Sequence, residues 1–144
     1  MKLSTKCRYG ARAIMEIARS YKQGPIKRKD IVKNQSISDS YLENILISLK
    51  TSGIIITLRG ASGGYMLRRS PSEVNLLEIV NALEGSLAPV ECLDNPSICP
   101  RTKTCATRVV WGKLKDAKEE VLRNCTVKEL IDNEEKSLGS SYCI

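Results

Sequence analysis

The sequence of 144 residues contains no histidine. This absence excludes histidine acid–base catalysis, Ser–His and Cys–His nucleophile pairs, and every metal site that requires an imidazole ligand. No other catalytic constellation is recognisable in the chain. We therefore do not expect an enzyme.

Long apolar segments are also missing. No run approaches the roughly 20 apolar residues that a membrane span needs, and residues 1–6 lack the apolar core of a signal peptide. We expect a cytoplasmic protein with no membrane partner. The length suits one modest domain, or a small domain plus a dimerisation element.

Charge is distributed unevenly along the chain. Residues 1–70 carry 14 Lys and Arg against 4 Asp and Glu, whereas residues 71–144 carry 9 against 12, for a net charge of +7. A strongly basic half attracts polyanions, and nucleic acid is the usual one because each neutralised phosphate releases a counterion.

Hydrophobic periodicity predicts three helices and then two short strands, at residues 4–22, 27–33, 38–51, 54–58 and 65–68. A glycine-rich connection that opens with Arg59 joins the strands and favours a hairpin. Helix, short helix, helix, hairpin is the order of a winged helix-turn-helix. The predicted fold class is mainly α with a small β-hairpin wing.

The second half of the sequence predicts a helix at 75–83 that ends at Gly85, an irregular loop, a long helix at 105–123 and a last helix from Thr126. We expect three parts. Residues 1–85 form the DNA-binding domain, residues 86–105 a cysteine-rich cluster-binding loop, and residues 106–144 the dimerisation helix and the C-terminal helix.

The helix at 38–51 is the predicted recognition helix. Its apolar stripe faces the core, so small polar residues near its N-terminus are free to reach base edges in the major groove. Ser40 and Glu43 also match a capping box. Basic residues that begin the preceding helix suit phosphate contacts, and an arginine on the wing suits the minor groove. The candidate DNA contacts are Arg28, Ser38, Ser40, Tyr41, Glu43, Asn44, Arg59 and Gly60.

Three of the six cysteines, Cys92, Cys99 and Cys105, have the spacing C-x6-C-x5-C. Structural zinc sites usually contain C-x2–4-C pairs, which this loop lacks. Widely spaced thiolates on an irregular loop favour an iron–sulfur cluster over zinc or free redox thiols, and all three remain open. Cys7 falls in the first turn of the first helix, where the helix dipole favours a thiolate, and the alternative is a small buried hydrophobic residue. Cys125 and Cys143 are treated as bystanders.

The chain resembles the IscR/NsrR-type bacterial regulators, a winged-helix family that includes iron–sulfur and cysteine-metabolism repressors. The matching segments are residues 1–6, Ser40-Tyr-Leu-Glu43, Arg59-Gly-Ala-Ser-Gly-Gly-Tyr65, Leu83-Glu-Gly85 and the three-cysteine loop through to Trp111. The resemblance covers nearly the whole chain, and the wing motif followed by three cysteines is highly specific.

The resemblance implies a homodimer joined through the long helix that reads a pseudo-palindromic double-stranded DNA operator. It implies an iron–sulfur cluster on Cys92, Cys99 and Cys105, of the 2Fe–2S type or alternatively 4Fe–4S. It also assigns Ser40 and Glu43 to base contacts and Arg59 to the wing contact.

The sequence departs from the family pattern at the fourth cluster ligand. Some members have a histidine where this chain has Arg108, and others recruit an acidic residue near a position that is Arg8 here. Cys7 stands where many relatives have glycine. Cys7 of the second chain is therefore a hypothetical fourth ligand.

These observations together predict a transcription regulator whose operator binding is controlled by a cluster that senses iron, oxygen or nitric oxide. One alternative is the same DNA-binding regulator with a thiol redox switch or a zinc site. Another is a regulatory subunit that binds a protein partner through its basic face.

Overall fold

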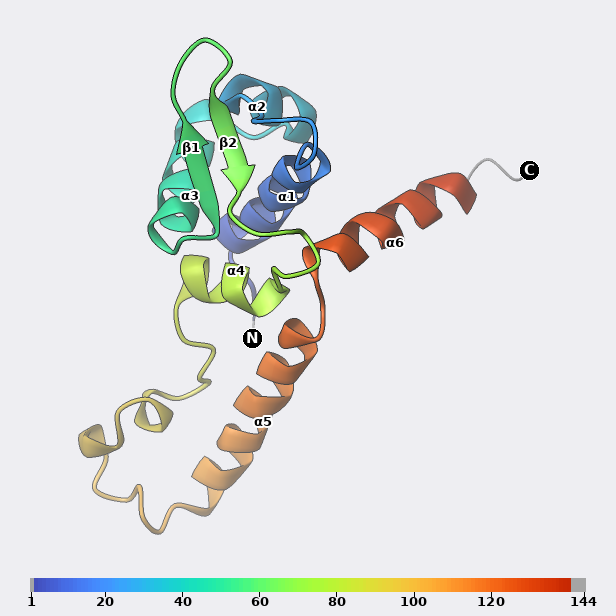
Figure 1. Cartoon of the computed structure of the whole chain (residues 1–144). Coiled ribbons are helices and arrows are strands. Elements are labelled where there is room, and N and C mark those ends of the chain that lie inside the picture. The colour runs from blue at the N-terminus through green and yellow to red at the C-terminus, as the bar shows by residue number, and fades with distance from the viewer. Residues whose placement is uncertain (1, 141–144) are drawn as a thin grey trace.

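The computed structural model describes residues 2–140 of the chain, with Cys143 outside this range. The described part contains six α-helices, one antiparallel hairpin and two short 3-10 helices (Figure 1). This confirms the predicted fold class. In chain order the elements are α1 (Thr5–Arg19), α2 (Arg28–Gln35), α3 (Asp39–Thr51), β1 (Ile55–Leu58), β2 (Gly64–Leu67), α4 (Leu76–Glu84), η1 (Glu91–Leu93), η2 (Pro96–Ile98), α5 (Ala106–Arg123) and α6 (Val127–Ser140).

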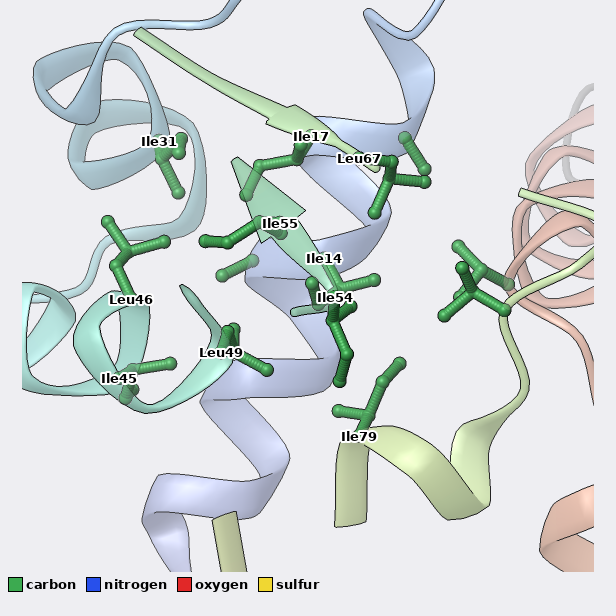
Figure 2. Close-up of a cluster of buried hydrophobic side chains, with 14 of the residues drawn as sticks. Ile14, Ile17, Ile31, Ile45, Leu46, Leu49, Ile54, Ile55, Leu67 and Ile79 are labelled. Atoms are coloured by element: carbon green, nitrogen blue, oxygen red, sulfur yellow. The ribbon is translucent and has the colours of Figure 1, made fainter. Parts of the chain in front are cut away.

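The hydrophobic core lies where α1 crosses α3, α4 and the hairpin (Figure 2). Each element contributes the apolar face that its sequence period defines, every third or fourth residue in the helices. The fully buried side chains include Ile14, Ile17, Ile31, Leu46, Leu49, Ile55 and Ile79. This core holds α3 by one face, which leaves the opposite face outward.

The hairpin pairs Ile55 with Leu67 and Leu58 with Gly64. Tyr65 also forms a two-way backbone bridge with Ile26, at 3.0 and 2.8 Å, so β2 is held on both sides. Gly64 permits this close approach, because a Cβ atom there would lie 2.3 Å from the carbonyl oxygen of Ile26. The wing is therefore attached to the segment that leads into α2.

The end of α1 and the N-cap of α3 differ from the predictions. Ser4 caps α1 as expected and accepts from the Cys7 amide at 3.1 Å, but α1 ends at Arg19 and a turn follows. The capping box predicted from Ser40 and Glu43 is wrong. Ser38 is the N-cap residue of α3, and the Glu43 carboxylate binds a side chain of α2 instead.

α5 and the loop before it extend away from the winged-helix elements as an arm (Figure 1). We use the name "arm" for residues 86–123. None of η1, η2 or α5 contains a buried residue. Just beyond the arm, the link to α6 and the start of α6 are joined to residues 71–76 by three backbone hydrogen bonds, Leu76 to Cys125 at 2.8 Å, Val127 to Val74 at 2.9 Å and Lys128 to Pro71 at 3.1 Å.

α6 returns from the arm toward α1 and contacts it. Val127 is fully buried, and Arg19 of α1 forms an ion pair with Glu134. The Thr126–Glu129 capping box predicted at the start of this helix is confirmed by reciprocal hydrogen bonds. Within residues 2–140, none of the helices combines the length and the apolar character needed to cross a bilayer.

Candidate DNA interface and cysteine loop

The outward face of α3 carries most of the predicted base contacts. Ser38, Ser40, Glu43 and Asn44 are exposed, because the buried stripe of the helix points the other way into the core. Ile47 lies on the same outward face and is 57% exposed. The helix therefore presents a row of small polar side chains with one large apolar side chain among them.

Tyr41 differs from the other predicted contacts because it is half-buried. Its ring packs edge-on against Tyr9 with 5.9 Å between the ring centroids, and the Arg12 guanidinium lies 5.4 Å from the Tyr9 ring. This stack joins α1 to the start of α3. Sequence spacing gave no signal for it, since Tyr9 and Tyr41 are far apart in the chain.

Arg28 does not point freely toward a partner. Its guanidinium binds both carboxylate oxygens of Asp39, at 2.9 and 3.0 Å, and Glu43 at 2.8 Å. This arrangement neutralises acidic charge at the start of α3, a surface where carboxylates would repel phosphate. Sequence reasoning missed Asp39, whose pairing depends on how α2 packs against α3.

Arg59 and Gly60 are exposed at the wing, as predicted. Gly60 has a φ of 106°, a conformation that glycine adopts without steric cost. The Gly63 amide donates to the Gly60 carbonyl at 3.0 Å, which closes the tip. The arginine is thus carried on a tight turn at the edge of the molecule.

Other basic groups surround α3. Lys6, in the first turn of α1, donates to the Ser48 hydroxyl at 3.0 Å, and Lys50 is exposed near the end of α3. The basic half of the sequence therefore places cations beside the outward face of this helix. That combination suits the edge of a duplex, where phosphates flank the bases.

The three loop cysteines lie at the far end of the arm. Cys92 is in η1, Cys99 follows η2, and Cys105 is the N-cap residue of α5. All three are half-buried and free. Among residues 2–140, no three Cys, Asp or Glu side chains form a group that could hold a metal ion.

Polar contacts join this loop to α5, and two of them lie close to its cysteines. Arg108 donates to the Cys92 carbonyl from both Nε and Nη2 at 3.3 Å, and Lys115 binds Asp94 at 2.8 Å. Arg108 therefore holds the loop backbone. Lys115 also lowers the pKa of Asp94, by a hydrogen bond to its carboxylate.

The cysteines differ in acidity. The Thr107 hydroxyl lies 3.2 Å from Cys105 Sγ, and with the backbone amides that begin α5 it lowers the pKa of the Cys105 thiol. Burial raises the pKa of Cys125, and the nearby Glu129 carboxylate adds to this. Cys105 is therefore the loop thiol best prepared to act as a thiolate. Thr107, two residues beyond it, was not identified from the sequence.

The predicted thiolate character of Cys7 is wrong. Cys7 is 2% exposed and packs with Leu77, Val80 and Leu87, and this burial raises its pKa to about 11. The Glu84 carboxylate adds to the effect. Desolvation and a like charge outweigh the helix dipole here. A buried protonated thiol is a poor metal ligand, so the structure gives no support to Cys7 as the fourth ligand.

α5 carries an apolar stripe that nothing in the described chain covers. Val110, Leu114 and Val121 are 57%, 44% and 70% exposed, and their spacing with Ala117 puts them on one face. At the base of this helix an apolar groove of about 360 Å³ is lined by Leu3, Leu87, Ala117, Lys118, Val121 and Leu122.

Comparison with known proteins decides the family. Residues 3–133 match the Rrf2 family, described as an iron-dependent transcriptional regulator. The chain belongs to the Rrf2 family. Protein rrf2 of Nitratidesulfovibrio vulgaris strain Hildenborough is 38% identical over 131 residues, which cover 91% of this chain and 87% of that protein. This confirms the resemblance seen in the sequence, because IscR proteins are also among the Rrf2 relatives.

Two solved structures of Rrf2 regulators have the same fold. CymR, the global cysteine regulator of B. subtilis, is 34% identical with a TM-score of 0.76 and covers 92% of this chain and 98% of its own. IscR of T. potens is 33% identical with a TM-score of 0.77 and covers 95% and 90%. The named relatives are transcription regulators, so this Rrf2 protein is a DNA-binding transcription regulator and not an enzyme.

Proposed function

We propose that this chain acts in the cytoplasm as a homodimer that reads a pseudo-palindromic operator. α3 enters the major groove, and Arg59 on the wing reaches the minor groove. Support comes from the exposed polar row on α3, its fixed rotation against the core and the basic groups beside it. A dimer presents two such helices to two half-sites.

The second copy covers the apolar stripe of α5. The helix has 18 residues and buries none of them within its own chain. Contiguous apolar surface of this kind marks an interface, and burying a Val or Leu side chain stabilises by about 1.5–3 kcal/mol. The stripe repeats every three or four residues, which suits a facing helix of the same sequence.

We further propose that Cys92, Cys99 and Cys105 hold an iron–sulfur cluster. Their thiol chemistry fits such a group. In the described loop the three do not form one metal-holding set, so binding requires the loop to rearrange. When bound, a cluster would supply a group that iron supply, oxygen and nitric oxide each build or destroy.

The attachment of the loop to α5 is the observation that supports control of DNA binding by the cluster. Arg108 holds the Cys92 carbonyl, and Lys115 holds Asp94. Drawing the thiols together changes these contacts, and α5 is the helix that sets one DNA-binding unit against the other. The two dimer arrangements must then have different affinity for the cluster, as any ligand-driven shift requires.

A thiol switch is the second candidate, favoured by the lowered pKa of Cys105. A thiolate reacts with oxidants far faster than a thiol. CymR of B. subtilis is named as a cysteine regulator, so the family is not restricted to one kind of signal. In this alternative the loop contacts change on oxidation of Cys105.

Anaerobic purification with a visible spectrum and with iron and sulfide assays tests the cluster. We expect matched iron and sulfide in the native chain, loss of both in Cys92→Ala, and retention in the control Cys125→Ala. Colourless protein after reconstitution contradicts the cluster. Altered DNA affinity on oxidation of that colourless protein, abolished by Cys105→Ser, would then favour the switch.

Salt dependence separates duplex binding from protein binding. For a duplex selected by this protein from a random pool, six to ten phosphate contacts reduce affinity by roughly 10³–10⁵ between 50 and 200 mM salt. We expect a loss in that range and a smaller slope for Arg59→Ala. Failure to select any duplex contradicts the proposed DNA interface.

A further inference from the structure

Ile47 is an unusual residue for the surface it occupies. It is 57% exposed, against 46% for Leu58 and 38% for Leu3, the next most exposed large apolar side chains within residues 2–85. The other apolar residues of α3 that face the core are fully covered, among them Leu42 and Ile45. An isoleucine in this position has more than half of its surface left uncovered by its own fold.

The position of Ile47 on the helix is set by its spacing from Ser40. Seven residues make two turns with an offset of about 20°, so the two side chains share one face. The helix rises about 1.5 Å per residue, which places Ile47 roughly 10 Å along the axis from Ser40. This distance corresponds to about three base pairs.

Its surroundings are polar and basic. Asn44 precedes it by nearly one turn, Lys50 follows it, and Lys6 reaches the neighbouring Ser48 hydroxyl at 3.0 Å. An apolar protein partner would need a contiguous patch, and Ile47 is a single apolar side chain among cations. The partner surface that complements this arrangement is anionic at its edges and carries an isolated apolar group.

We propose that Ile47 is a specificity-determining residue that contacts the 5-methyl group of one thymine in each operator half-site. The thymine methyl is the one apolar group that base edges present in the major groove. The inference rests on the proposed placement of α3 in that groove. Ser40 and Asn44 then make the polar contacts, and Ile47 adds a preference for thymine a few base pairs away.

Uracil substitution tests the contact because it removes only the methyl group. The probe is the duplex that the native protein selects from a random pool, with each thymine replaced in turn by uracil. At one symmetry-related pair of positions, we expect native affinity to fall about fourfold per half-site and about fifteenfold when both are replaced. Ile47→Ala is expected to bind thymine and uracil equally at this pair.

Matched variants keep the outcomes distinct. Leu138→Ala, which changes a side chain of similar exposure on α6, should retain the native uracil profile. If Ile47→Ala also retains that profile at every thymine, the inference is overturned. In that case Ser40→Ala and Asn44→Ala show which hypothesis has failed. If either variant weakens binding or changes the selected sequence, only the Ile47 contact is excluded. If neither does, the placement of α3 in the major groove is excluded as well.

Discussion

The winged-helix elements and the arm treat apolar residues in opposite ways. α1, α3 and α4 together bury Ile, Leu, Val and Ala side chains from several faces, whereas α5 buries none although it contains Val, Leu and Trp. The first region satisfies its own hydrophobic pattern. In the second region the apolar stripe of α5 stays exposed unless a surface from another molecule covers it.

The two regions also place their functional groups differently. In the winged helix the proposed DNA contacts project from a helix whose rotation the core determines. In the arm the cysteines project from a loop that is held against α5 by polar contacts, among them those of Arg108 and Lys115. The comparison teaches that the core fixes the proposed DNA-binding surface, whereas the loop with the proposed cluster ligands is held by polar contacts at the surface.

A cavity in the core should give the largest effect. Leu49 is fully buried, and Leu49→Ala is expected to lower the free energy of unfolding by about 2–5 kcal/mol. Val109→Ala, at a side chain that is 62% exposed on α5, should change it by about 0.5 kcal/mol or less. Urea unfolding at one protein concentration measures both. Equal losses would show that the arm contributes to the same core.

Thiol reactivity should differ strongly between the two regions. With a pKa of about 11 instead of 9.0, Cys7 has roughly a hundredfold less thiolate at neutral pH than an ordinary thiol. In the cluster-free protein we expect iodoacetamide to modify Cys105 well before Cys7, as peptide mapping over time would measure. Similar rates at pH 7.5 would contradict the burial of Cys7.

The same pKa gives a pH dependence of stability. Folding keeps Cys7 protonated, so its contribution is complete below pH 9.0 and is lost as the pH rises from 9.0 to about 11. Cys7→Ala should remove this part of the alkaline loss, and Cys99→Ala should retain it. Unfolding measured across pH 8–11 tests the difference.

A charge in the apolar stripe should weaken dimerisation while leaving the winged helix folded. Val121→Asp removes a contact worth about 1.5–3 kcal/mol per buried side chain, and a homodimer loses two of them, which corresponds to roughly a 10²- to 10⁴-fold weaker dimer. Val109→Asp makes the same change about 120° around the helix from Val121 and is the control. Analytical ultracentrifugation measures both. A native dimer in Val121→Asp would exclude the stripe as the interface.

The smallest effect on stability is expected at Arg28. Its exposed ion pairs are each worth under about 1 kcal/mol, so Arg28→Ala should unfold nearly as the native chain does. Duplex affinity should fall because Asp39 and Glu43 are no longer neutralised, and adding Asp39→Asn should restore part of it. A direct phosphate contact predicts no restoration and a salt slope reduced by about one.

Local patterns in the sequence were enough to predict much of the fold. Periodicity located the helices and the hairpin, Ser4 capped α1, and Gly85 ended α4 with a φ of 80°. The rotation of α3 was also predictable, because its buried stripe determines which residues face outward. These features depend on residues close together in the chain.

Features that depend on distant residues were not predictable. Burial of Cys7 comes from Leu77 and Val80 on α4, which no spacing near residue 7 reveals. The partner of Tyr41 lies on α1, and that of Arg28 lies across a turn on α3. The arrangement of the loop cysteines depends on how residues 91–104 fold, and their spacing alone does not determine it.

The backbone hydrogen bonds just beyond the C-terminal end of α5 fix this end of the arm, so the arm can pivot about it. The three bonds join residues 125–128 to residues 71–76, which end at the first residue of α4. A helix of 18 residues is about 27 Å long, so a displacement of about 2 Å at the far end of α5 requires a rotation of only about 4° about its fixed end. Small rearrangements of the cysteine loop would then change the angle between α5 and the winged-helix elements. In the proposed dimer, this angle sets the distance between the two α3 helices and so the spacing of the half-sites that they fit.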